Sequence, residues 1–434
     1  MNLASLSQRK FVQSIGRVPA RVRRGLSEYR FYAYLSVLGP GIIAASSGNE
    51  ASGIATYSTA GAEYGYSLLW TFVPMTIFFI AAQEMCVRMG VVTGQGLADL
   101  IREQFGVRWT AVVMLALLIA NSGIIVAEFI GIAQASELFG ISRYISVPIA
   151  AAAIWWLVVR GTQRLVERIF LLMSLVFLTY VVSAFLTKPE WSAIGREFIT
   201  PSFSLDAAYL FTVVALIGTT ITPFMHVFIQ SSVVEKGLDE EELPMARADA
   251  IAGVIFANII AVFIVISTAA TLHTEGVELN DAADAARALS PVLGEYATWL
   301  FAIGLFGAAM LAMGVLPLAT AYSLSEALGV EKGLSRSFRE APIFLGIFTG
   351  LIVFGALFAL VPGLPQIQIL LLTQCVNGLL LPVLLVAIVV LANNEEIMGE
   401  YRNRLPHNIF AIGTTLIVSV LSLLLIGKTI VDFF

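Results

Sequence analysis

The sequence predicts an all-α membrane protein with about eleven transmembrane helices, and three observations lead to this. Of the 434 residues, 58% are hydrophobic and only 13% are charged, about half the charged share of an ordinary soluble domain. Apolar stretches of membrane-spanning length recur along the chain. The first and the sixth of these stretches are interrupted near their middle by Gly, Ser, Thr and Pro. This composition excludes a water-soluble enzyme. The interruptions indicate that these two spans do more than anchor the protein in the membrane.

Eleven stretches are long enough to cross a bilayer, which takes about 20 mainly apolar residues. They cover residues 33–62, 66–92, 109–138, 144–160, 168–187, 208–234, 247–272, 296–325, 341–361, 366–392 and 407–427. We expect a single transmembrane domain over residues 33–434, preceded by a basic segment at residues 1–32. That segment is not a signal peptide, because no short apolar core with a small-residue cleavage site follows its basic start. We expect it to lie near anionic lipid in the cytoplasm.

The distribution of Lys and Arg predicts the orientation. With the N-terminus in the cytoplasm, all but five of the 25 Lys and Arg residues lie on the cytoplasmic side, as the positive-inside rule requires. The five on the outer side are Arg143, Lys188, Arg196, Arg287 and Lys428. Eleven spans then place the C-terminus outside. We expect a multi-pass protein of the plasma (inner) membrane, working as a monomer, and a net charge of −5 gives no reason to expect nucleic-acid binding.

Two spans are broken where a simple anchor would be continuous. The first is interrupted at residues 46–53 and the sixth at residues 218–223, where Pro223 frees backbone carbonyls around Thr219. Non-helical backbone at membrane depth survives only inside the protein or beside a cavity. If spans 1–5 and 6–10 are two repeats, the breaks occupy matching positions, which is typical of the central site of a secondary transporter. The repeats cover residues 33–187 and 208–392, followed by an extra helix at 407–427.

Polar side chains inside the spans are the candidate site residues. Glu50 lies in the first break, and a carboxylate at the bilayer centre costs at least a few kcal/mol unless it is paired. Glu128 either relays protons or is held by an arginine or by the backbone, and a structural partner is the simpler interpretation. Gln374 is either a contact between helices or an oxygen ligand. Asn377, one turn away, is expected to be a contact between helices.

Enzyme chemistry and cofactors are not predicted. The two cysteines, Cys86 and Cys375, lie in separate apolar runs without a CxxC motif, and the three histidines do not cluster. A zinc or redox site is therefore not expected, and the nucleotide-binding P-loop is absent. Glu84 and Arg88, one helical turn apart, are expected to form a structural ion pair.

Motifs along nearly the whole chain from Gly39 resemble those of the Nramp family of divalent-metal transporters. They include Gly39-Pro40-Gly41, the run AGAEYGY at residues 60–66, AEFIG at residues 127–131 and IMGEY at residues 397–401. The resemblance implies the leucine-transporter-like fold, with two inverted repeats of five helices and broken helices 1 and 6. It also implies a divalent metal cation as the transported substrate.

The metal ligands that the resemblance implies are only partly present. Counted without gaps, the family's Asp-Pro-Gly-Asn motif falls on residues 50–53, so Glu50 replaces the aspartate and Gly53 replaces the asparagine. The Met-Pro-His motif of span six falls on residues 222–224, so Thr222 replaces the thioether ligand. The metal position therefore loses its sulfur ligand if this register holds.

Other implied ligands are retained or shifted. Thr219 matches the position that offers a backbone carbonyl, and Gln374 matches the glutamine of span ten. One extra residue follows the span-six motif, so Met225 or His226 would substitute if the register slips, although packing is the simpler interpretation of both. Asn49, beside Glu50, is a further candidate ligand.

The implied site is built from oxygen atoms, and the small Gly53 leaves room for a cation that keeps its waters. Mg²⁺ dehydrates reluctantly and is bound through one or two carboxylates plus waters, whereas a thioether selects softer metals. We therefore expect a Nramp-related magnesium transporter that also imports Mn²⁺. Obligatory proton coupling is not expected, because the family's proton-linked aspartate falls on Ile125 and its histidine on Phe224.

Two alternatives stay open at this point. One is a proton-coupled transporter of Mn²⁺ or Fe²⁺, for which Glu128 and His226 would have to carry protons. The other is an amino-acid transporter on the same fold, in which the N–H groups at the helix breaks would bind a carboxylate. Glu50 argues against the second alternative, because it would repel that carboxylate.

Overall fold

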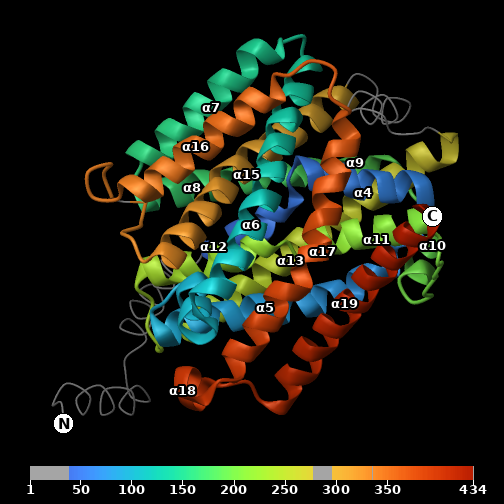
Figure 1. Ribbon diagram of the computed structural model, residues 1–434. Helices are drawn as coiled ribbons and strands as arrows, with labels where there is room; N and C mark the ends of the chain where they lie inside the picture. The colour runs from blue at the N-terminus through green and yellow to red at the C-terminus, as the bar shows by residue number, and fades with distance from the viewer. Residues whose placement is uncertain (1–38, 277–295, 335, 434) are drawn as a thin grey trace, which may run out of the picture. The chain divides into compact units, whose positions relative to one another are not determined.

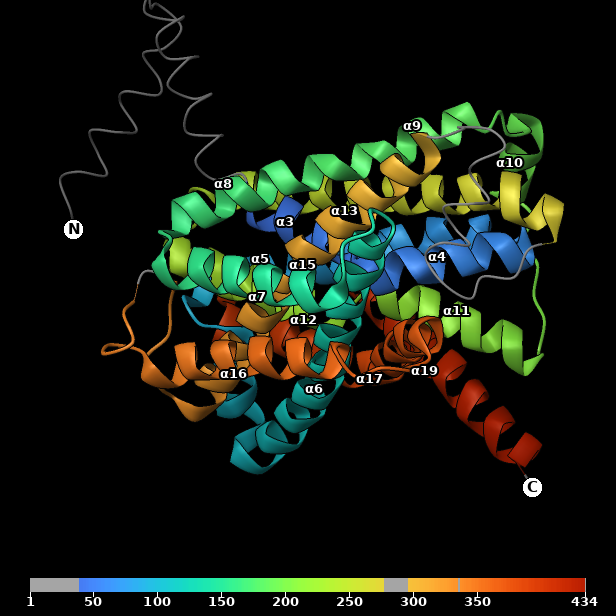
Figure 2. The same ribbon diagram turned by 90° about the horizontal axis from the view of Figure 1, so that it is seen from above.

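The computed structural model describes residues 39–276, 296–334 and 336–433, and this part of the chain is helical without a strand. The predicted basic segment at residues 1–32 and the first six residues of the predicted first span lie outside the described residues. Figures 1 and 2 show the described helices packed side by side around broken helices in the interior. The predicted all-α fold class is confirmed.

Ten helices in the described ranges are long and apolar enough to cross a membrane, and they match predicted spans two to eleven. Eight of these consist mainly of one element: α5 (Phe72–Thr93), α6 (Leu97–Glu137), α7 (Arg143–Arg160), α13 (Leu243–Thr268), α15 (Tyr296–Leu328), α16 (Pro342–Ala359), α17 (Gln366–Asn393) and α19 (Leu405–Phe433). Span five consists of α8 (Gln163–Ser174), η4 (Leu175–Phe177) and α9 (Leu178–Leu186). Short elements connect them: η3 (Leu69–Thr71), α10 (Trp191–Glu197), the π-helix η5 (Ala269–His273), α18 (Glu395–Met398) and η6 (Gly399–Tyr401).

The first predicted span is not among these ten, because it is broken into pieces. Its parts are α3 (Pro40–Ser46), the 3₁₀ turn η2 (Ser47–Asn49) and α4 (Ala51–Tyr64). Between η2 and α4, Glu50 has the extended backbone angles φ −64° and ψ 174°. The Ser- and Gly-rich run predicted to interrupt this span therefore does so at Glu50.

The sixth span is broken between α11 (Ala207–Thr220) and α12 (Pro223–Lys236). Ile221 and Thr222 leave the helical region, with ψ angles of 56° and 135°. Pro223 then starts α12, a position where its missing N–H is not needed. Figure 2 shows that the chain passes through α3 and α4 in one direction and through α11 and α12 in the opposite direction, as an inverted repeat requires.

Close backbone packing holds the inner half of the first span. A Cβ on Gly41 would lie 2.5 Å from the backbone nitrogen of Ala250 in α13, so only glycine fits there. The carboxylate of Asp249, also in α13, accepts hydrogen bonds from the backbone N–H groups of Gly39 (3.1 Å) and Gly41 (2.6 Å). The start of α3 is therefore fixed to α13.

A structural ion pair forms where the sequence predicts it. Arg88 Nη2 lies 3.1 Å from Glu84 Oε2, and Arg247 of α13 bonds the other oxygen of Glu84 at 2.7 Å. Arg88 also donates to the carbonyl of Tyr401 (2.7 Å) and to Asn403 (2.5 Å). The pair thus joins α5, α13 and the loop before α19.

The outer face of the helix bundle is apolar. Trp156 on α7 and Leu357 on α16 are each 64% exposed, and Leu423 on α19 is 67% exposed. Exposed apolar side chains in such number are incompatible with water and expected against lipid. The described helices therefore form a multi-pass membrane protein, as the sequence predicts.

Candidate functional site

Glu50 lies at the centre of the candidate site and is fully buried. Its Oε1 accepts hydrogen bonds from Gln374 Nε2 (2.6 Å) and from the hydroxyl of Ser52 (3.3 Å). Its Oε2 makes no hydrogen bond to the described residues. A buried carboxylate oxygen without a hydrogen-bond partner is costly in a packed interior, and such atoms gather at functional sites. Oε2 is therefore the atom through which Glu50 can bind a cation.

Glu128 of α6 lies next to Glu50 and caps the start of α4. Its carboxylate accepts hydrogen bonds from the backbone N–H groups of Ala51 (2.8 Å) and Ser52 (3.1 Å) and from the Ser52 hydroxyl (2.8 Å). Of the two partners that the sequence left open, an arginine and the backbone, the structure shows the backbone, because these N–H groups, freed by the break, satisfy the carboxylate. The second buried carboxylate is thus bonded to the same serine as the first.

Ser52 is a site residue that the sequence reasoning did not single out. Its hydroxyl contacts both Glu50 and Glu128, and it also accepts a hydrogen bond from Gln374 Nε2 at 2.7 Å. The only sequence signal is its position two residues after Glu50 in the broken stretch. Nothing in the sequence shows that α6 and α17 both reach that stretch.

The two breaks touch each other at Gly48 and Thr219. The Thr219 hydroxyl donates to the carbonyl of Gly48 at 3.3 Å. A Cβ on Gly53 would lie 2.5 Å from that carbonyl and 2.6 Å from the Thr219 hydroxyl. The expectation that Gly53 leaves room for a hydrated cation is therefore wrong, since backbone and side chain from both breaks fill that space. Gly53 permits their close approach.

Thr222 bonds to another candidate ligand. Its hydroxyl donates to the carbonyl of Thr219 at 2.9 Å, and both residues are fully buried. A carbonyl oxygen has two lone pairs, so Thr219 keeps one that a cation could use. Asn49 is tied elsewhere, because its amide nitrogen donates to the carbonyl of Ala257 in α13 at 3.0 Å.

Met225 and His226 point in different directions. A Cβ on Gly48 would lie 3.3 Å from the sulfur of Met225, which places the thioether against the first break. The ring of His226 instead contacts Phe79 of α5, with ring centroids 6.0 Å apart. Of these two candidates, only Met225 is shown beside the break in span one.

Gln374 joins α17 to the site. It is fully buried, as is Asn377, whose amide nitrogen donates to Gln374 Oε1 at 3.3 Å. Asn377 was expected to connect two helices, but this bond lies within α17. The structure thus brings Glu50, Ser52, Glu128 and Gln374 into one hydrogen-bonded cluster.

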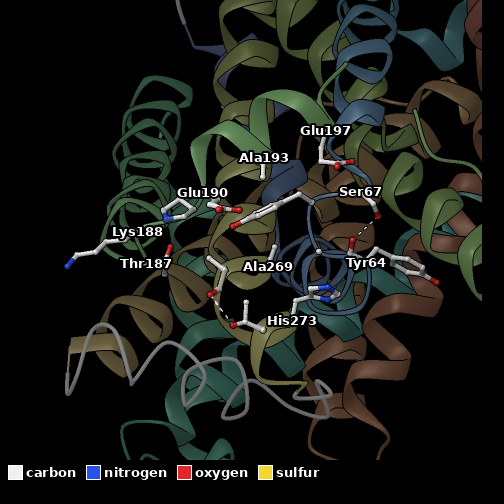
Figure 3. Close-up of a pocket in the computed structure, with 14 residues that line it drawn as sticks. Tyr64, Ser67, Thr187, Lys188, Glu190, Ala193, Glu197, Ala269 and His273 are labelled. Atoms are coloured by element: carbon white, nitrogen blue, oxygen red, sulfur yellow. Dashed lines mark hydrogen bonds between the residues drawn. The ribbon is translucent and has the colours of Figure 1, made fainter. Parts of the chain in front are cut away.

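Two cavities lie along α4, beyond the break. A cavity of about 160 Å³ is lined by Thr56, Thr59 and Glu63 of α4 together with residues of α11 and Leu371 of α17. A larger cavity of about 470 Å³ surrounds the end of α4, with Tyr64, Glu190 and His273 in its wall (Figure 3). None of the predicted ligands lines either cavity. In the described residues no three His, Cys, Asp or Glu side chains gather as a metal site. The acidic side chains of the cluster are those of Glu50 and Glu128.

The family model described as natural resistance-associated macrophage protein-like matches residues 41–428. The chain belongs to the Nramp family. Three relatives are each named divalent metal cation transporter MntH. The protein of Deinococcus radiodurans is 26% identical over 404 residues, covering 90% of this chain and 88% of its own. That of Burkholderia ambifaria is 27% identical, covering 89% and 87%. That of Yersinia pestis is 28% identical, covering 89% and 92%.

Solved structures agree with the predicted fold of this Nramp chain. A manganese transporter of Eremococcus coleocola matches with a TM-score of 0.77 at 21% identity, covering 93% of this chain and 88% of its own. MhsT in complex with L-phenylalanine matches with a TM-score of 0.56 at 15% identity, covering 89% and 98%. The predicted leucine-transporter-like fold is thereby confirmed.

Proposed function

We propose that this protein imports divalent metal cations, with Mg²⁺ as the preferred cation and Mn²⁺ as the second. It does so as a secondary transporter of the plasma (inner) membrane, with its N-terminus in the cytoplasm. The transport domain is residues 33–434, built from repeats 33–187 and 208–392 and the helix 407–427. The observation that carries the proposal is Glu50, fully buried in a broken span with one carboxylate oxygen that no described group satisfies.

The oxygen atoms around Glu50 that could act as metal ligands favour a hard cation. Besides Glu50 Oε2, the candidate ligands are the carbonyl of Thr219 and the side-chain oxygen of Gln374, with Thr222 at the second break. Oxygen ligands suit Mg²⁺ and Mn²⁺. Glu128 adds a second negative charge beside Glu50, which favours a divalent over a monovalent cation.

The residues near the site support the proposal of passive import without obligatory proton co-transport. Ile125 and Phe224 cannot carry protons, and Glu128 is held by α4. His226 contacts Phe79 rather than the described carboxylates. A positive-outside potential contributes about 2.3 kcal/mol per charge per 100 mV, enough to drive a divalent cation inward.

A proton-coupled Mn²⁺ or Fe²⁺ transporter is the second candidate, and Met225 is the observation that favours it. Its thioether lies against Gly48 in the first break, and sulfur ligands select softer metals. An amino-acid transporter is disfavoured, because the buried carboxylates of Glu50 and Glu128 would both repel a substrate carboxylate.

The proposal is tested with purified protein by calorimetry and by uptake into liposomes. We expect saturable heats with Mg²⁺ and Mn²⁺, and none with a panel of amino acids. Mg²⁺ should enter liposomes when the lumen is negative. Protein-free liposomes are the control. Heat from an amino acid but from no divalent cation would refute the proposal, and binding of Mn²⁺ with no response to Mg²⁺ would support the second candidate.

A further inference from the structure

The side-chain amide of Gln374 faces Glu50 with its nitrogen. Gln374 Nε2 donates to Glu50 Oε1 at 2.6 Å and to the Ser52 hydroxyl at 2.7 Å. Its oxygen points the other way and accepts from Asn377 Nδ2 at 3.3 Å. All four side chains are fully buried. In this arrangement Gln374 presents donors, and a donor repels a cation.

Gln374 can become a cation ligand only through its oxygen. A half-turn about the bond that carries its amide exchanges Oε1 and Nε2 without moving the backbone. The nitrogen then points to Asn377, where it meets the donating Nδ2 of that side chain. Two donors facing each other in a buried place are unfavourable, because each loses its hydrogen bond.

Asn377 has the atom that resolves this conflict. Its Oδ1 is buried and makes no hydrogen bond to the described residues. If the Asn377 amide also turns, Oδ1 accepts from Gln374 Nε2, and the hydrogen bond between the two side chains is preserved. Each arrangement therefore keeps one hydrogen bond between Gln374 and Asn377, with the donor and acceptor roles exchanged.

The backbone around the pair is held in place, so the exchange is confined to the side chains. A Cβ on Gly218 of α11 would lie 2.0 Å from the carbonyl oxygen of Gln374, and a Cβ on Gly378 would lie 2.4 Å from the carbonyl oxygen of Val214. α11 and α17 thus touch backbone to backbone on both sides of the pair. Rotation of two amides needs no change in this contact.

We propose that Asn377 is a positioning residue that sets cation affinity through the orientation of the Gln374 amide. The inference rests on the proposed function, because it assumes a divalent cation at Glu50. With the Gln374 nitrogen toward Glu50, its N–H group interacts with the Glu50 carboxylate in place of a cation. With the paired amides turned, Gln374 Oε1 joins Glu50 Oε2 as a ligand.

Two variants of nearly equal size test the proposal in opposite directions. An ionised carboxylate in Asn377→Asp only accepts hydrogen bonds, so it holds Gln374 Nε2 and turns Oε1 toward the cation. Calorimetric Kd values for Mg²⁺ and Mn²⁺ at pH 8 should fall about tenfold, the effect of one hydrogen bond. Asn377→Leu leaves the Gln374 oxygen unpaired in one arrangement and its nitrogen unpaired in the other. A buried N–H without a partner is tolerated less well than a buried carbonyl oxygen, so the same Kd values should rise, by about threefold.

A charge at position 377 could also attract the cation directly, and a double-mutant cycle separates the two effects. In a Gln374→Leu background the affinities with Asn, Asp and Leu at position 377 should be equal within twofold. If Asn377→Asp tightens binding by the same factor there, the charge acts directly and the proposal is overturned. The proposal is also overturned if, with Gln374 present, the proteins with Asn, Asp and Leu at position 377 have equal Kd values.

Failure of the proposed function gives a different result. A wild-type protein without heat from any divalent cation contradicts both proposals, whereas wild-type binding with unchanged Asn377 variants contradicts only this one. Gel-filtration profiles and thermal unfolding of every variant show whether it is folded. If Asn377→Asp does not give folded protein, the cycle is completed with Asn377→Leu. The rise in Kd that Asn377→Leu causes must then disappear in the Gln374→Leu background.

Discussion

Single atoms decide which residues of the site can bind a cation. Of the two carboxylate oxygens of Glu50, one is shared by Gln374 and Ser52 and the other is free of hydrogen bonds to the described residues. The sequence predicted that Glu50 belongs to the site, because it is a carboxylate in a broken apolar span, and the family resemblance added Gln374. It did not predict the role of Ser52 or the orientation of the Gln374 amide, since both depend on how α4, α6 and α17 meet.

Glu50→Gln should abolish divalent-cation transport and leave the protein folded. The amide removes the negative charge at the site and replaces one carboxylate oxygen by a nitrogen that repels cations. Uptake of Mg²⁺ and Mn²⁺ into liposomes measures the loss, and thermal unfolding checks the fold. Glu396→Gln, at an exposed position of α18, is the matched control and should transport normally. Wild-type uptake by folded Glu50→Gln would remove Glu50 from the site.

Thr222→Met should shift selectivity toward softer metals. It brings a thioether to the position that the family motif implies, and it removes the hydroxyl that bonds the Thr219 carbonyl at 2.9 Å. Competition of Cd²⁺ or Mn²⁺ against Mg²⁺ should become stronger by about tenfold. Met225→Leu is the companion variant. An unchanged ratio in Thr222→Met, together with weaker Mn²⁺ competition in Met225→Leu, would show that the sulfur ligand is Met225.

The broken helices are the elements that the sequence predicted best. Gly, Ser and Pro mark both interruptions, and the extended residues fall within the predicted stretches 46–53 and 218–223. The space at Gly53 could not be predicted, because it is filled by the carbonyl of Gly48 and by Thr219 from the other break. Which half-helix fills which gap depends on the packing of segments far apart in the sequence.

Gly53→Ala should lower the unfolding temperature and strongly reduce transport. Its Cβ would lie 2.5 Å from the Gly48 carbonyl and 2.6 Å from the Thr219 hydroxyl, so the two breaks must move apart. Overpacking of this kind costs about 1–3 kcal/mol. Gly346→Ala in α16 is the control, because a Cβ there meets nothing within 4 Å. An unfolding temperature in Gly53→Ala equal to that of the control would show that the breaks are not in close contact.

At the scale of the whole molecule, hydrophobicity and the positions of polar residues predicted the fold class and the spans, and helix breakers predicted that the first and the sixth span are divided. The lateral arrangement of the helices did not follow from the sequence itself but from the family resemblance. The repeat relation was likewise inferred from the placement of the breaks, because the halves show no convincing identity. The two broken spans run in opposite directions in Figure 2, which is structural support for an inverted repeat that sequence identity did not provide.

Cation uptake by the whole protein should proceed without obligatory proton co-transport. A proton route needs a chain of titratable groups from the site to the cytoplasm, and Ile125 and Phe224 interrupt the one that the family resemblance implies. The measurement uses a pH-sensitive dye inside liposomes during Mg²⁺ or Mn²⁺ uptake, and the internal pH should stay constant. Acidification that follows metal uptake and disappears in Glu128→Gln or His226→Ala would contradict this expectation.

The meeting of four half-helices at the breaks has an electrostatic consequence. α3 and α11 reach the breaks with their carboxyl ends, whose partial negative charge attracts a cation, whereas α4 and α12 reach them with amino ends that repel it. At α4 the carboxylate of Glu128 binds the first two N–H groups, and at α12 the first residue is Pro223, which has no N–H. Both repelling dipole ends are thereby weakened. Under the proposed function, Glu128 therefore helps cation binding as a fixed charge even when no proton moves.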